Sequence, residues 1–443
     1  MLGEYRIQGR RAADIAASVE EAVGAGDLAP GRALPPLREL ARELGVNPNT
    51  VAAAYRTLRD RGVIETDGRR GSRIRARPAS TARESLRVET PPGGRDVSTG
   101  NPDPALLPPL GEALAAAARR YAARPTLYGA PDAGDDLRAL AREAFDADGV
   151  AGGPVAVTSG SLDAIERVLT ARLKPGDAVA VEDPGWGSLL DLVPALGLRA
   201  LPVAVDDEGP LPGAVERALR EGARALVVTC RAQNPTGAAL TAGRAAELRT
   251  LLSGHPRLLL VEDDHGHGIV DLPLHPLSGC VRHWVLVRST AKAYGPDLRL
   301  AVLTGDPVTV DRVRGRQRLG PGWVSHLLQD TVTHLWRSGA VDARAVAREY
   351  DAKRDALVRA LRDRGVTAYG RSGMNVWVPV PDETGAVARM LQSGWVVAPG
   401  ARFRMRAPAG VRVTVSPLAA RDIEPVAEAL VAAAGSAPAG RYD

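Results

Sequence analysis

The chain has 443 residues, of which 45% are hydrophobic and 25% are charged. This length and composition suit a globular protein of two or three domains, and they exclude a single small binding module and a disordered or fibrous chain. The sequence has no membrane-spanning apolar run, no secretory start and only two cysteines, so we expect a cytoplasmic protein.

Positive charge is concentrated near the start of the chain. Residues 1–78 contain fourteen arginines and ten acidic residues, and they therefore carry four of the five excess positive charges. A local excess of this kind predicts a polyanion as partner.

The texture of the sequence changes along the chain and predicts its domains. Residues 1–78 are helical in pattern and basic at their end, whereas residues 79–95 are rich in Ser, Thr, Pro, Gly and charge and are typical of a linker. Residues 96–443 form the remainder: over about 96–330, short apolar runs alternate with helical segments, which predicts an α/β lobe with a parallel sheet between helices. From about residue 331 to about residue 435 the pattern changes to long amphipathic helices followed by short strands, which predicts a smaller α+β lobe.

Two short helices are predicted within the first 78 residues. Residues 37–44 have apolar side chains at helical spacing and are followed by Gly45, a natural helix stop. Asn49 or Thr50 can cap a second helix over residues 51–61. Two such helices joined by a short turn predict a helix-turn-helix, whose second helix presents its start to the major groove of DNA.

A hairpin follows these helices in the sequence. Residues 64–66 and 72–75 are strand-like, and the segment 67–71 between them has a basic tip that would lie on phosphates or in a minor groove. The alternative is a helical bundle with a charged loop exposed to solvent.

The first 78 residues closely resemble the winged helix of GntR-type bacterial regulators. The resemblance rests on Leu34 to Ala41, Asn47 to Val51, Ala54-Tyr55, Leu58 and Gly62 to Ile64, and it departs from the family at Pro36, where a serine is usual. It implies that the DNA-contacting candidates are Arg38, Asn49, Thr50, Tyr55, Arg69, Arg70 and Arg73.

A lysine directly follows one of the apolar strands of the second part. Lys292 is one of three lysines in the chain and comes just after the strand 285–287. A Schiff base needs a primary amine that can lose its proton, which arginine cannot do. The alternative is an ordinary solvated lysine.

Other polar groups also follow strands, in a fixed order along the chain. Residues 158–163 place small hydroxyl residues and a glycine between a strand and a helix, which favours a phosphate site. The later strand ends offer an aromatic face, an amide, a carboxylate and a guanidinium, and these are Trp186, Asn234, Asp263 and Arg299.

This ordered set resembles the fold-type I pyridoxal phosphate proteins, and residues 96–435 resemble class I/II aminotransferases. The resemblance implies that Lys292 forms a Schiff base with the cofactor, that Asp263 holds the pyridine nitrogen, and that Asn234 bonds the ring hydroxyl. Trp186 would stack on the ring. The residues that would hold the phosphate are Ser159, Gly160, Ser161, Ser289 and Arg299.

The same resemblance implies two further roles. Arg412 would bind a substrate carboxylate, and Tyr128 would reach the phosphate of the neighbouring subunit, which implies a dimer.

The sequence departs from the aminotransferase pattern after Asp263. A tyrosine commonly stands two or three residues later, whereas this chain has His265, which could donate to the ring oxygen and titrates near neutral pH. The alternative is that His265 points away from the cofactor and packs or meets water. The pair His265 and His267 also suggests a metal site, but no third ligand follows at metal-site spacing, so we expect no metal.

A winged helix joined to an aminotransferase-like domain resembles the MocR-type subgroup of GntR regulators. The resemblance implies a DNA-binding transcriptional regulator that senses pyridoxal phosphate, or an amino compound that reacts with it, and that forms a head-to-tail homodimer. The alternative is a working aminotransferase that carries a DNA-binding domain. A nucleotide-sensing regulator is disfavoured because the sequence has no Gly-rich dinucleotide or P-loop motif.

Overall fold

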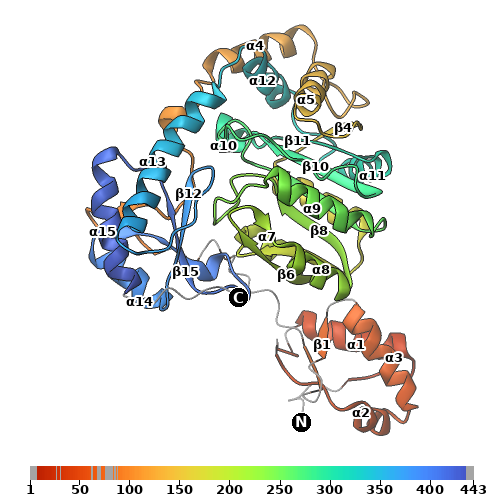
Figure 1. Ribbon diagram of the computed structural model, residues 1–443. Helices are drawn as coiled ribbons and strands as arrows, with labels where there is room; N and C mark the ends of the chain where they lie inside the picture. The colour runs from red at the N-terminus through yellow and green to blue at the C-terminus, as the bar shows by residue number, and fades with distance from the viewer. Residues whose placement is uncertain are drawn as a thin grey trace. The chain divides into compact units, whose positions relative to one another are not determined.

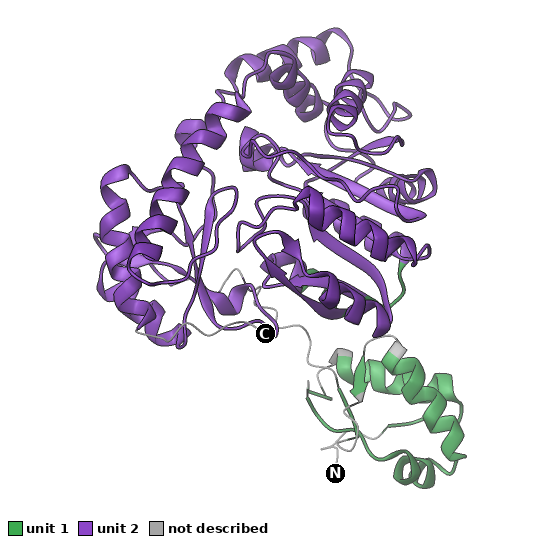
Figure 2. Cartoon of the chain, in the orientation of Figure 1, with its two compact units in different colours: residues 1–82, 173–178, 191–199 green, residues 83–172, 179–190, 200–443 purple. Residues whose placement is uncertain are grey.

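Figure 1 shows a computed structural model of the chain, and the description below covers residues 7–25, 27–29, 31–60, 63–66, 71–74, 83, 86 and 88–435. The chain divides into two compact units (Figure 2). The first comprises residues 1–82 with the short segments 173–178 and 191–199, and the second comprises the rest. Within the described residues, no helix is long and apolar enough to cross a membrane.

The described residues between 7 and 74 form three helices and a two-stranded antiparallel sheet, the order of a winged helix. Val51, Ala54 and Leu58 are fully buried in its core, as their helical spacing predicts. The elements are α1 (Ala12–Ala25), α2 (Leu37–Leu44), α3 (Pro48–Asp60), β1 (Ile64–Thr66) and β2 (Ser72–Ile74).

The ends of α2 follow the sequence closely. Gly45 adopts the left-handed conformation with φ 65°, and the next amide, of Val46, donates to the carbonyl of Ala41, which closes the helix. Pro36 precedes α2 and gives it no side-chain cap, since the usual hydroxyl is missing.

The start of α3 differs from the prediction. The helix begins at Pro48, and the side chain of Asn47 accepts the amide of Asn49 at 2.9 Å. The predicted caps, Asn49 and Thr50, therefore lie inside the first turn. Proline suits the first helical position because its missing N–H would have no partner there.

The large lobe of the second unit contains an eight-stranded sheet in the order β4-β11-β10-β9-β8-β5-β6-β7. Every residue of β4, β5 and β9 is buried, so both faces of the central sheet are covered, as the continuous apolar runs predict. The strands are β4 (Val155–Thr158), β5 (Ala178–Asp183), β6 (Arg199–Asp206), β7 (Gly209–Pro210), β8 (Ala223–Thr229), β9 (Leu259–Asp264), β10 (His283–Ser289) and β11 (Ala301–Gly305).

The sheet is mixed rather than fully parallel, which corrects the sequence prediction. The strands β8, β9 and β10 are parallel, but β11 runs antiparallel to both β10 and β4. Ser289 pairs with Ala301, so the chain turns back at the same end of the sheet. The segment 290–300 is shorter than the dozen or more residues that a parallel crossover needs.

Helices connect these strands and extend beyond them. Figure 1 shows α4, α5 and α12 together beside the β4 edge of the sheet. The helices are α4 (Gly111–Ala123), α5 (Asp135–Ala147), α6 (Ser161–Arg172), α7 (Gly187–Ala195), α8 (Pro212–Arg220), α9 (Ala242–Ser253), α10 (Ala291–Tyr294), α11 (Pro307–Arg318) and α12 (His326–Arg337).

A smaller α+β lobe ends the chain. Its antiparallel sheet has the order β12-β15-β14, and a short parallel pair joins β13 to β3, which comes from the end of the predicted linker. Figure 1 shows α13 leading into this lobe beside α15. The elements are β3 (Arg95–Asp96), α13 (Ala343–Asp363), β12 (Asn375–Pro379), α14 (Glu383–Gln392), β13 (Trp395–Val396), β14 (Ala398–Pro399), β15 (Gly410–Thr414) and α15 (Ile423–Ala434).

Candidate functional site

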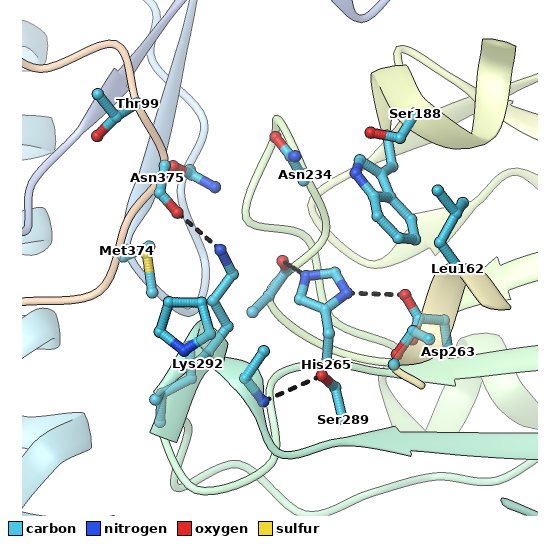
Figure 3. A pocket seen from close by; sticks show the side chains of 18 of the residues that line it. Thr99, Leu162, Ser188, Asn234, Asp263, His265, Ser289, Lys292, Met374 and Asn375 are labelled. Atoms are coloured by element: carbon cyan, nitrogen blue, oxygen red, sulfur yellow. Dashed lines mark hydrogen bonds and ion pairs between the residues drawn. The ribbon is translucent and has the colours of Figure 1, made fainter. Parts of the chain in front are cut away.

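The loops that follow β4, β5, β8, β9 and β10 meet around a cavity of about 360 Å³ in the second unit (Figure 3). In open α/β sheets, ligands bind outside the carboxyl ends of the strands. The cavity brings together most of the site residues expected from the sequence, which are Gly160, Ser161, Trp186, Asn234, Asp263, His265, Ser289, Lys292, Arg299 and Arg412.

One part of the cavity is formed where β4 turns into α6. Gly160 has φ 100°, and a Cβ there would lie 3.0 Å from Nη2 of Arg299. This Nη2 atom donates to the carbonyl of Ser159 at 3.0 Å, so Ser159 holds the arginine and does not line the cavity itself. The hydroxyl of Ser161, the first residue of α6, is buried without a hydrogen-bond partner among the described residues. A helix start, a guanidinium and an unsatisfied hydroxyl fit a phosphate group.

The end of β9 presents a carboxylate to the cavity. Asp263 is buried, and its Oδ2 lies 2.9 Å from Nδ1 of His265. Its Oδ1 is buried and has no partner within the described part of the chain. A buried carboxylate oxygen without a donor is costly, so this atom fits an N–H group of a ligand.

Lys292 lies in α10, directly after β10 and Ser289. Figure 3 shows its side chain extending into the cavity, and Nζ donates to the carbonyl of Gly100 at 2.7 Å. Of the other two lysines, Lys353 binds Asp103 at 3.1 Å outside this cavity, and Lys174 belongs to the first unit.

His265 has protein partners on both ring nitrogens. Nδ1 faces the carboxylate of Asp263, and Nε2 lies 2.7 Å from the carbonyl oxygen of Ala232. Burial lowers the pKa of His265, but the negative charge and hydrogen bond of Asp263 outweigh it, so the pKa is raised above its ordinary value. Both nitrogens can donate at once only in the protonated ring. A hydrogen bond from His265 to the ring oxygen, the role expected from its place in the sequence, would require one of these two partners to be exchanged for the cofactor.

Arg412 is a buried cation on β15 of the small lobe. Its Nη1 donates to Oδ1 of Asn234 at 2.9 Å, and its Nη2 donates to the carbonyl of Ser98. Its guanidinium carbon lies 4.6 Å from the ring centre of Phe403. These contacts fix a planar fork of donors at the cavity, which is the geometry that binds a carboxylate.

Further lining residues were not anticipated from the sequence. Thr99 and Gly100 follow the linker, Arg402 and Phe403 precede β15, and none of them lies at a strand end of the central sheet. The one sequence feature that could have pointed to Phe403 is that the chain has only two phenylalanines.

Tyr128 lies away from the cavity of its own chain. Its side chain is 95% exposed and makes an edge-to-face contact with Trp323, with ring centres 5.7 Å apart.

The second histidine of the predicted pair belongs to a buried ionic cluster. Ligand atoms of Asp148, Asp264 and His267 lie within 4.8 Å of one another. Arg231 binds Asp264 at 2.8 Å, and Arg288 binds both aspartates. The two guanidinium groups already supply the positive charge that a metal ion would bring.

The DNA-contacting candidates separate into surface and core. Arg38 in the first turn of α2, Asn49 in the first turn of α3 and Arg73 on β2 are exposed, and Thr50 is half-buried. Tyr55 is instead 4% exposed and donates from its hydroxyl to the carbonyl of Pro35 at 2.9 Å, so it is a core residue with little surface for DNA. Arg69 and Arg70 lie outside the described residues.

The fold and the cavity are those of an aminotransferase-like domain joined to a winged helix, and comparisons with known families agree with this class. Residues 96–430 match the family model described as aminotransferase class I and II, and residues 11–74 match bacterial regulatory proteins of the gntR family. A solved structure of LysN, an α-aminoadipate aminotransferase from Thermus thermophilus, has a TM-score of 0.69 at 25% identity and covers 80% of this chain and 95% of its own.

Two regulators are among the curated relatives, and one of them aligns over nearly the whole of both chains. The vitamin B6 salvage pathway transcriptional repressor PtsJ of Salmonella typhimurium is 41% identical, over 95% of this chain and 98% of its own. The pyridoxine biosynthesis transcriptional regulator PdxR of Corynebacterium glutamicum is 30% identical over 58% of each chain. The chain belongs to the class I and II aminotransferase family and, as a whole, to the MocR-type GntR regulators.

Proposed function

We propose that this chain is a transcriptional regulator that binds DNA through its winged helix and senses a ligand in the cavity beside Lys292. The ligand is pyridoxal 5′-phosphate or a small amino compound that reacts with it. One observation carries the proposal. Two buried polar atoms, Oδ1 of Asp263 and the hydroxyl oxygen of Ser161, have no hydrogen-bond partner among the described residues, and both residues line the same cavity as Lys292. The same chain also has a winged helix.

The cofactor of the cavity is pyridoxal 5′-phosphate, whose ring draws electrons from an attached amine. Lys292 would supply the amine that holds it, and Oδ1 of Asp263 would accept a hydrogen bond from the protonated pyridine nitrogen. Trp186 covers the ring, and Asn234 bonds its hydroxyl while it orients Arg412 for a carboxylate. The phosphate is held by Gly160, Ser161, Ser289 and Arg299, with Ser159 fixing the arginine.

The partners are double-stranded DNA and a second copy of the chain. The dimer is head-to-tail, with Tyr128 of each chain at the phosphate of the other, and it works in the cytoplasm, where it reaches DNA. Residues 1–78 form the DNA-binding domain, 79–95 the linker, and 96–443 the sensor with lobes at about 96–330 and 331–435.

Transamination is the second candidate function. It is favoured because Lys292, Asp263, Asn234 and Arg412 are assembled in one cavity, so the groups that a turnover requires are in place.

The proposal is tested by the absorbance spectrum of the purified protein and by its DNA affinity, each measured before and after addition of candidate amino compounds. A visible band that shifts with one amine, together with a change in DNA affinity at the same concentration, is the expected result. A protein without a visible band after incubation with pyridoxal phosphate would contradict the cofactor assignment. A protein without salt-dependent DNA affinity would contradict the regulator.

A further inference from the structure

The loop of residues 400–407 forms part of the cavity wall. Arg402 and Phe403 line the cavity, and the side chains of both are buried. The ring of Phe403 lies against the guanidinium of Arg412, which is placed to bind a carboxylate. A ligand that engages Arg412 therefore also meets this loop.

The backbone of the loop is tied to the turn that carries Trp186. The carboxylate of Asp183 accepts three consecutive amides, those of residues 405–407, at 2.7 to 2.9 Å. The amide of Gly185 donates to the carbonyl of Phe403 at 2.7 Å. Trp186 also lines the cavity. The loop therefore connects the part of the cavity wall at Trp186 with the part at Arg412.

A residue of the linker is also bound to this loop. Arg83 lies within the predicted linker 79–95, and its Nη1 donates to the carbonyl oxygens of Ala401 and Arg404, each at 2.9 Å. These two residues flank Arg402 and Phe403. A linker side chain thus clamps the segment whose side chains face the ligand.

We propose that Arg83 is a positioning residue that couples the occupancy of the cavity to the linker, and through it to DNA binding. The inference rests on the proposed function and specifies how the site is read. A ligand that moves Arg402 or Phe403 displaces the carbonyl groups of Ala401 and Arg404. The hydrogen bonds from Arg83 to these carbonyls are then present either in the ligand-bound loop or in the ligand-free loop, but not in both. Hydrogen bonds from a charged donor are strong enough to bias such an equilibrium.

Thermodynamic linkage makes this coupling measurable from both sides. If pyridoxal phosphate changes the affinity for DNA by some factor, then DNA changes the affinity for pyridoxal phosphate by the same factor, typically about 5- to 150-fold. A residue that carries the coupling reduces both factors together when it is replaced. A residue that only stabilises the fold does not.

The test uses the full chain, pyridoxal phosphate, and a fluorescent duplex selected in vitro for binding to the full-length protein. The Kd for the duplex is measured with and without saturating pyridoxal phosphate, and the Kd for pyridoxal phosphate with and without saturating duplex. In the wild type both ratios differ from one by the same factor. In Arg83→Ala both fall to within about twofold of one.

Two matched variants complete the test. Arg83→Lys keeps most of the coupling, because an ammonium group can also donate to both carbonyls. Arg249→Ala keeps all of it: Arg249 also makes two hydrogen bonds to a backbone carbonyl, that of Pro276, but away from the loop. An Arg83→Ala protein with wild-type ratios would overturn the inference and leave the proposed function intact. A wild type whose two ratios equal one, with pyridoxal phosphate alone and again after addition of the candidate amino compounds, would overturn the proposed sensing itself.

Hydrogen exchange gives a second readout if Arg83→Ala does not fold. In the wild type, duplex binding should change the exchange rates of the amides of residues 401–407 by about tenfold or more. Unchanged rates in this loop would also overturn the inference.

Discussion

Lys292 places a primary amine inside the cavity, and its Nζ is held at 2.7 Å from the carbonyl oxygen of Gly100. The lysine follows β10 directly, so a rigid strand of the central sheet sets its position. A group fixed in this way meets an aldehyde in one orientation, whereas a solvated lysine would not.

The first prediction concerns this amine. With pyridoxal phosphate bound to Lys292 the protein should be yellow, and borohydride reduction followed by peptide mapping should place the cofactor label on this lysine. Lys292→Arg should be colourless because a guanidinium cannot form the Schiff base. Lys353→Arg is the matched control and should stay yellow. A label on Lys174 or Lys353 would contradict the assignment.

His265 links the departure from the aminotransferase pattern to Asp263. The protonated ring donates to Asp263 and to the carbonyl of Ala232, and the pKa of His265 is raised in the folded protein. A raised folded pKa contributes stability that is fully present below the unfolded value of about 6.5 and is lost as the pH rises through the folded value.

The second prediction follows from that sign. Relative to His265→Gln, the cofactor-free wild type should lose stability as the pH rises above about 6.5, as measured by urea unfolding at a series of pH values. At lower pH the variant should be less stable by about 1 to 3 kcal/mol, because a buried charged donor is removed. If the unfolding free energies of the two proteins differed by the same amount at every pH, the pKa of His265 would be the same in the folded and unfolded states.

The visible spectrum offers an independent check of the same pair. With pyridoxal phosphate bound, the pH titration of the wild type should be broader than that of His265→Tyr, because a phenol stays neutral over the range in which His265 loses its proton. Superimposable titrations would remove His265 from the cofactor site.

At the scale of elements, α3 and β2 divide the work expected of a winged helix. Asn49 is exposed in the first turn of α3, where we propose that it contacts base edges, and Arg73 is exposed on β2, where we propose that it contacts phosphates.

The third prediction separates these roles. Arg73→Ala should weaken binding to all duplexes and lower the salt slope by about 0.9, as expected for one lost phosphate contact. Asn49→Ala should change the preference at one base pair by about 1 to 3 kcal/mol and leave the slope unchanged. Both are measured by fluorescence anisotropy, with Arg257→Ala, an exposed arginine of the large lobe, as control. Equal loss on all sequences for Asn49→Ala would remove it from base readout.

At the scale of the whole molecule, the exposure of Tyr128 is one feature that a single chain leaves unexplained. Leu127 beside it is 72% exposed as well, although both lie in a well-formed lobe. A second copy of the chain would cover such a surface.

The fourth prediction tests whether Tyr128 serves the partner. Tyr128→Phe should weaken cofactor binding about tenfold or more, because a hydrogen bond to a charged phosphate is lost. Mixing Tyr128→Phe chains with Lys292→Ala chains should then restore one native site per mixed dimer, measured as tight binding of pyridoxal phosphate. If Tyr128 acted within its own chain, mixing would restore none.

The sequence by itself determined those features that depend on local spacing. Gly45 ends a helix because glycine adopts a φ of 65° without steric cost. The apolar runs of β5 and β9 form buried strands because both of their faces are covered. The order of Ser161, Asp263 and Lys292 along the chain also placed them correctly in one cavity, since neighbouring strand ends converge at one edge of a sheet.

Only the tertiary structure decided contacts between segments that are distant in sequence. The pairing of β11 with β4, the burial of Tyr55 against Pro35, the contact of His265 with Ala232 and the hydrogen bonds of Arg83 to the 400–407 loop each join such segments. No local pattern encodes these pairs, because each depends on how whole elements pack. The order of polar groups along the chain therefore predicted most of those that gather at the cavity from the strand ends, and packing determined the remaining lining residues and which atoms are in contact.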